Sequence, residues 1–158
     1  MKTLVIGLGN PILGDDGVGW RIAERVRSQI DATLQVDVDC LSIGGISLME
    51  HLVGYESAIL IDAFVGDEQP GSILVSKLED LPNYSAFHIT SVHDTSLQNA
   101  MKLGREMGAE LPENITVVGV AARHVYDFSE ELSAPVEEAI PKATQIVVDL
   151  LKRNIMIQ

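Results

Sequence analysis

Short runs of apolar residues alternate along the chain with segments in which apolar residues recur at helical spacing. The short runs are rich in Val, Ile and Leu and are bounded by glycine or polar residues, a pattern that predicts buried strands. These strands are expected over residues 2–7, 34–40, 57–61, 71–77 and 115–120. The helical pattern predicts helices over 15–30, 47–53, 96–107 and 135–153. Asp15 or Asp16 is expected to cap the first helix, and Pro141 is expected to kink or divide the last.

The order of these elements predicts an α/β protein with a three-layer sandwich, helices covering both faces of a five-stranded, mostly parallel sheet. Only about eight residues separate the third strand from the fourth, whereas a parallel crossover needs a dozen or more. The fourth strand is therefore expected to run antiparallel. No linker or repeat interrupts the pattern, so residues 1–158 are expected to form a single domain.

The charge balance and the cysteine content exclude several classes of function. The 23 acidic residues outnumber the 11 basic ones, for a net charge of −12, which disfavours a nucleic-acid partner. No apolar run approaches the ~20 residues of a membrane span, so no membrane partner is expected. Cys40 is the only cysteine, which excludes an internal disulfide and a four-cysteine zinc site. Cys40 is interpreted as a structural thiol, and a cytoplasmic location is expected.

Two carboxylates are expected to meet at one edge of the sheet. Ligands of open α/β sheets bind outside the carboxyl ends of the strands, where the strand order reverses. If the second and third strands flank the first, this point lies between the first and third strands. The loop after the first strand carries Asp15 and Asp16, one of which should serve the helix N-terminus while the other faces the crevice. Asp62 follows the third strand directly, although it could instead accept backbone N–H bonds of the next turn.

A nitrogen ligand for a metal could come from any of four histidines: His51, His88, His93 and His124. His51 lies in a predicted helix and is expected at the surface. His88 and His93 lie in the loop before the third helix, and His124 follows the fifth strand. A loop histidine is more often incidental than a ligand, but an imidazole with two carboxylates would suit nickel or zinc.

The glycines of GLGNPILGDDG do not indicate a bound dinucleotide. Their spacing departs from G-x-G-x-x-G, and two aspartates stand where the pyrophosphate would lie. No cofactor-binding loop is therefore expected.

Five segments resemble the hydrogenase maturation proteases in their order and spacing: GLGNPILGDDGVG, AILIDAF, SVHDTSL, ITVVGVAA and LSAPVEEAIPKA. The resemblance covers about residues 3–151. It implies an endopeptidase that removes the C-terminal extension of the nickel–iron hydrogenase large-subunit precursor after nickel insertion. It also implies that Asp16, Asp62 and His93 are the catalytic and metal-binding residues, and that the precursor supplies the nickel.

Two segments depart from the pattern of that family. DCLSIGGIS lacks the family's Asp-Gly-Gly-Thr sequence, and Asp39 is the candidate replacement for its acid. GVAARH replaces a Gly-Ile-Gln-Pro or Gly-Ile-Glu-Pro sequence, so Arg123 and His124 could contact a different precursor. Two alternative functions stay open: a non-catalytic chaperone that checks nickel loading, and a small-molecule hydrolase with residues 78–95 as a lid.

Overall fold

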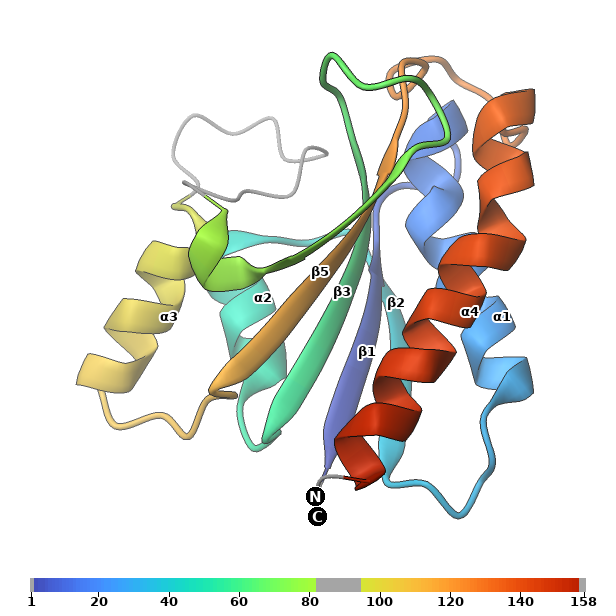
Figure 1. Ribbon diagram of the computed structural model, residues 1–158. Helices are drawn as coiled ribbons and strands as arrows, with labels where there is room; N and C mark the ends of the chain where they lie inside the picture. Colours follow the sequence, from blue (N-terminus) through green and yellow to red (C-terminus); the bar gives the residue numbers. More distant parts are fainter. Residues whose placement is uncertain (1, 82–94, 157–158) are drawn as a thin grey trace.

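The computed structural model describes residues 2–81 and 95–156 and has three layers, with a central sheet between two pairs of helices (Figure 1). The strands are β1 (Thr3–Leu8), β2 (Val36–Leu41), β3 (Ser57–Phe64), β4 (Ile73–Lys77) and β5 (Asn114–Ala121). The helices are α1 (Val18–Gln29), α2 (Gly45–Leu52), α3 (Leu97–Glu106) and α4 (Ala134–Met156), with short 3₁₀ helices η1 (Gly14–Gly17) and η2 (Leu78–Asp80). The predicted α/β sandwich is confirmed.

The sheet has the strand order β2-β1-β3-β5-β4. All neighbouring strands are parallel except β4, which runs antiparallel to β5 as the short connection predicted. Since β2 and β3 flank β1, the strand order reverses between β1 and β3. The carboxyl ends of these two strands are therefore the expected place for a site.

Each face of the sheet buries its own hydrophobic core. Ile59 and Ile61 of β3 pack in the core beneath α1 and α4, whereas Ala58 and Leu60 pack beneath α2 and α3. Successive side chains of a strand point to opposite faces. Asp62 therefore continues the row of Ala58 and Leu60 and faces the side covered by α2 and α3.

Two glycines allow α1 to approach the sheet at backbone distance. A Cβ on Gly19 would lie 2.4 Å from the Leu8 carbonyl oxygen and 2.5 Å from that of Ile61. A Cβ on Gly7 would lie 2.4 Å from the Gly19 carbonyl oxygen and 2.8 Å from Ala23 Cβ. Only glycine fits at these two positions without a shift of the backbone. The close contact holds the first turn of α1 over the ends of β1 and β3.

The third strand is longer than its apolar run predicted. β3 continues beyond residues 57–61, with Asp62 paired to Gly119 and Phe64 paired to Ala121. Asp62 therefore lies within the strand rather than after its end. The reason is the ladder with β5, which fixes the backbone of these residues whatever their intrinsic preference.

The start of the first helix also differs from the prediction. Asp15 and Asp16 lie within η1, the N-cap position of α1 is Gly17, and no side chain caps either helix. The prediction that one aspartate caps this helix is wrong. Both carboxylates instead accept hydrogen bonds from more distant groups, Asp16 from Asn10 and Asp15 from Ser133.

The two C-terminal helices begin and end close to the predicted residues. Ser96 caps α3 by accepting the Asn99 N–H at 3.2 Å, and Gly108 follows the helix with φ of +86°. α4 runs through Pro141 without dividing into two segments, because buried residues on both sides of the proline hold it against the sheet. Among the residues that the structure describes, no helix combines the length and hydrophobicity needed to cross a membrane.

A polar cluster ties the amino ends of three neighbouring segments together. Asp37 of β2 accepts hydrogen bonds from the Tyr55 hydroxyl at 2.6 Å and from Lys2 Nζ at 2.8 Å. The hydrogen bond to Asp37 raises the pKa of Tyr55 to about 12, and the Lys2 and Tyr55 bonds lower the pKa of Asp37. This cluster stabilises the amino edge of the sheet, away from the carboxyl ends of the strands.

Gly19→Ala should destabilise the fold, because its Cβ would meet two backbone carbonyl oxygens that cannot rotate away. We expect a loss of about 1–3 kcal/mol in the free energy of unfolding, the usual cost of overpacking. Gly104→Ala in α3 is the matched control, since its Cβ would meet only the flexible ends of Met49 and Leu111. Urea unfolding followed by circular dichroism measures both changes. Equal stability of the two variants would contradict the close approach of α1.

Candidate active site

The loop after β1, residues 9–17, folds back on itself and buries Asp16. The Asn10 N–H donates to Asp16 Oδ2 at 2.8 Å, and the Asp16 N–H donates to the Leu13 carbonyl at 3.1 Å. Gly9 has φ of +135°, and a Cβ there would lie 1.9 Å from the Asp16 carbonyl oxygen. Glycine is therefore required for this turn. The Asp16 side chain is only 1% exposed and is held beyond the end of β1.

Asp62 lies near the carboxyl end of β3 and is 2% exposed. Its partner across the sheet is Gly119 of β5, and the preceding residue, Ile61, pairs with Gly7 of β1. The Phe64 ring covers Gly119, since a Cβ on that glycine would lie 2.8 Å from Phe64 Cδ1. The neighbours of this buried carboxylate on β5 are thus apolar.

The structure brings the segments of Asp16 and Asp62 together. η1, which contains Asp16, contacts β3, which contains Asp62. Three residues after Asp16, Gly19 lies against the carbonyl of Ile61, the residue before Asp62. The segments of both carboxylates therefore meet beside the carboxyl ends of β1 and β3.

Asp15 has a different partner, which the sequence analysis did not identify. Its Oδ1 accepts the Ser133 N–H at 2.7 Å, and its Oδ2 accepts the Ser133 hydroxyl at 2.8 Å. Ser133 directly precedes α4, so Asp15 joins the loop of Asp16 to the start of the last helix. The two residues are 118 positions apart, and no local pattern in the sequence could have indicated the pair.

The histidines in the described residues lie at the surface. His51 is exposed on α2, as predicted, with Nδ1 2.9 Å from the Ser47 carbonyl oxygen. His124 is exposed in the loop after β5, with Nδ1 3.2 Å from Asp127 Oδ2. His88 and His93 lie outside the described residues.

Thr95, the first residue described after this gap, lies beside the start of α2. A Cβ on Gly45, at the start of α2, would lie 3.2 Å from the carbonyl oxygen of Thr95. Thr95 is two residues after His93 and thus lies beside α2, on the face toward which Asp62 points. Over residues 2–81 and 95–156 alone, no three acidic, histidine or cysteine side chains form a metal-binding group.

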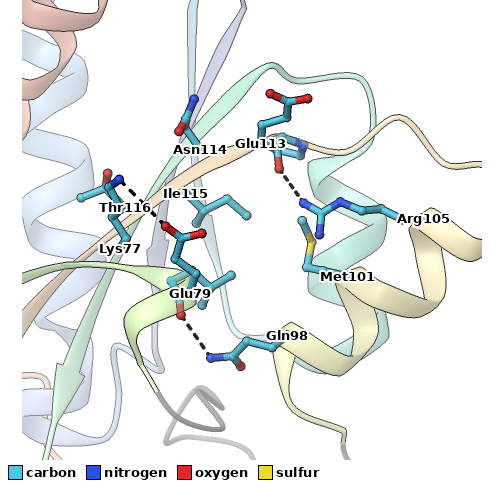
Figure 2. Close-up of a pocket in the computed structure, with 11 residues that line it drawn as sticks. Lys77, Glu79, Gln98, Met101, Arg105, Glu113, Asn114, Ile115 and Thr116 are labelled. Atoms are coloured by element: carbon cyan, nitrogen blue, oxygen red, sulfur yellow. Dashed lines mark hydrogen bonds and ion pairs between the residues drawn. The ribbon is translucent and has the colours of Figure 1, made fainter.

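A cavity of about 270 Å³ lies away from these carboxylates, at the amino end of β5. Figure 2 shows Arg105 reaching from α3 toward the segment before β5, where it donates to the Pro112 carbonyl at 3.0 Å. Lys77 in the same wall lies 3.9 Å from Glu79. The cations of this cavity already have partners, and its place in the sheet separates it from Asp62. It therefore does not support a small-molecule active site at the crevice.

Cys40 shows no feature of a reactive thiol. Burial raises the pKa of its thiol, which donates to the Trp20 carbonyl at 3.8 Å. A nucleophilic cysteine needs the opposite shift, toward the thiolate. The surroundings of Cys40 therefore favour its interpretation as a structural thiol.

Known proteins of the same fold are peptidases that mature hydrogenases. The hydrogenase maturating endopeptidase HybD from Escherichia coli superposes with a TM-score of 0.78 at 26% identity, covering 98% of this chain and 94% of that one. The hydrogenase 2 maturation peptidase from a Thaumarchaeota archaeon gives a TM-score of 0.70 at 29% identity, covering 96% and 99%. In sequence, the hydrogenase 2 maturation protease of Escherichia coli K12 is 27% identical over 155 residues, covering 98% of this chain and 93% of that protein.

The family model for hydrogenase maturation proteases matches residues 20–150. The chain therefore belongs to the hydrogenase maturation protease family and is an endopeptidase of that kind. This membership confirms the family and the activity that the sequence motifs implied, and it disfavours both the chaperone and the small-molecule hydrolase. The matched range includes Asp62 and His93, whereas Asp16 lies just before it.

Asp15→Ala should weaken the fold and slow cleavage, because both hydrogen bonds to Ser133 are lost and the loop of Asp16 is released. We expect a loss of about 1.5–3 kcal/mol in the free energy of unfolding. Asp15→Asn should retain most of the stability and activity, since its Oδ1 can accept the Ser133 N–H and its Nδ2 can donate to the hydroxyl. Thermal unfolding and cleavage of the precursor measure the two variants. An inactive but fully stable Asp15→Asn would instead assign the Asp15 charge to the chemistry.

Proposed function

We propose that this protease removes the C-terminal extension of a nickel–iron hydrogenase large-subunit precursor after nickel has been inserted. The observation that carries the proposal is the pair of buried carboxylates, Asp16 and Asp62, at the crevice between β1 and β3 in a member of this family. Carboxylate oxygens are ordinary ligands of divalent cations. A divalent cation brought by the precursor would find two such groups at this end of the sheet.

The proposed metal-recognising residues are Asp16, Asp62 and His93. Two carboxylate oxygens and an imidazole nitrogen form a donor set suited to a borderline ion such as nickel, and they leave coordination positions for the precursor's own ligands. The family motif SVHDTSL supports the inclusion of His93. The nickel in this scheme belongs to the substrate.

The contribution of the chain itself is the placement of the substrate. A divalent cation bound there would supply Lewis acidity for peptide hydrolysis at neutral pH. Asp16 is fixed by the Asn10 N–H, and Asp62 is fixed by the ladder with β5. Because both carboxylates are held, a precursor whose metal docks against them presents its C-terminal segment in one orientation. Such pre-organisation converts binding into a rate advantage.

Asp62→Asn should remain folded but lose processing, because the amide keeps the shape of the side chain and removes its charge. We expect the cleavage rate to fall by at least about 100-fold, comparable to the loss of one electrostatic contact in other active sites. Asp67→Asn, at an exposed position after the same strand, is the control and should cleave like the wild type. Mass spectrometry of the precursor C-terminus reports cleavage, and circular dichroism reports folding. Wild-type cleavage by well-folded Asp62→Asn would make this carboxylate structural.

Cleavage should depend on the nickel of the precursor more than on the sequence of the removed peptide. A precursor without metal has nothing to bind between Asp16 and Asp62, so it should remain unprocessed at enzyme concentrations that fully process the loaded form. The measurement compares precursor prepared with and without nickel, each with wild-type enzyme. Equal cleavage of both forms, with a chelator present throughout, would rule out metal recognition.

A further inference from the structure

The segment after β5, residues 122–133, lies against the loop that carries Asp16. Figure 1 shows it in orange beside the start of α1. Leu13 and Ser129 form a parallel β-bridge, in which the Ser129 N–H donates to the Ile12 carbonyl at 3.0 Å and the Gly14 N–H donates to the Ser129 carbonyl at 2.8 Å. The Asp15 N–H donates to the His124 carbonyl at 2.9 Å. The loop that carries Asp16 and this segment are therefore one continuous surface.

The segment is also held from beneath and at its far end. Val125 is only 4% exposed and packs in the core beneath α1 and α4. Arg21 of α1 donates to the Glu130 carbonyl at 2.9 Å, and Ser133 donates twice to Asp15. Residues 126–128, between these attachments, are thus presented on a fixed backbone. A fixed surface loses little conformational entropy when a partner binds.

The exposed side chains of this segment and of the adjoining loop include apolar and aromatic ones. Phe128 is 87% exposed, Tyr126 is 70% exposed, and Ile12 on the adjoining loop is 47% exposed. Ile12 and Phe128 each precede a residue of the β-bridge, so they are neighbours across it. The whole chain has only three phenylalanines, three tyrosines and one tryptophan. Two exposed aromatic residues within residues 126–128 are therefore a local cluster. Arg123 is exposed on the same segment.

We propose that Ile12, Arg123, Tyr126 and Phe128 form the surface on which the folded body of the hydrogenase large-subunit precursor docks. This inference rests on the proposed function. A protein that brings its metal to Asp16 also meets the segment paired with the loop of Asp16, and these side chains are exposed on that segment and loop. Aromatic residues and arginine are the residue types that contribute most to protein–protein affinity. The matching surface of the precursor is expected to be apolar and to adjoin its C-terminal segment.

The test separates binding from cleavage by single-turnover kinetics on nickel-loaded precursor with excess enzyme. Phe128→Ala and Tyr126→Ala should each raise the half-saturating enzyme concentration about tenfold, as truncation of an interface anchor does. Their cleavage rates at saturation should stay within about twofold of wild type, since neither residue reaches the reacting groups. Met107→Ala is the matched control, because Met107 is 77% exposed at the end of α3, far from the crevice. It should change neither value.

Several outcomes would overturn the docking surface. An unchanged half-saturating concentration for both aromatic variants would do so, and so would a lower saturated rate at unchanged half-saturation. The surface could instead bind a second copy of the chain, which sedimentation of the free enzyme tests. A wild-type dimer that dissociates in Phe128→Ala, while this variant cleaves normally, would establish that contact. Failure of the wild-type enzyme to cleave loaded precursor would refute the proposed function itself, which is a separate result.

Discussion

The close contact between α1 and the sheet is the constraint on which the candidate site depends. Gly19 lies against the carbonyl oxygens of Leu8 and Ile61, and Gly7 lies against the backbone of Gly19. With any side chain at these positions, the helix would move outward and carry η1 with it. Asp16 would then leave the crevice, although every other element of the sandwich could still form. The position of the buried Asp16 carboxylate thus depends on the absence of a Cβ atom at Gly7 and Gly19.

The crevice concentrates unfavourable electrostatics in one place. Asp16 and Asp62 are both nearly fully buried, in a chain whose net charge of −12 already repels further anions. Burial of carboxylates costs free energy unless hydrogen bonds or a cation compensate it. The neighbouring segment after β5 has the opposite character, since it exposes aromatic side chains to water.

The extent to which the sequence predicts this structure follows from the range of each interaction. Local periodicity and connection length were sufficient for the five strands and for the direction of β4. The apolar run predicted that Asp62 directly follows the third strand, but its pairing with Gly119 extends β3 beyond that predicted end. The role of Asp15 could not be predicted, because its partner Ser133 belongs to a distant segment. Asp16 and His93 were assigned from family motifs, which carry information that spacing alone does not.

The hydrogen bonds between Asp15 and Ser133 have a consequence for the order in which the protein is assembled. They join positions 118 residues apart, and closure of so long a loop is slow compared with the formation of helices and nearby strands. During synthesis, β1 and the loop of Asp16 leave the ribosome long before α4 exists. The crevice therefore stays incomplete until the last helix docks beside α1. Until residue 133 has been made and has folded beside the loop of Asp16, both of these hydrogen bonds of Asp15 are missing.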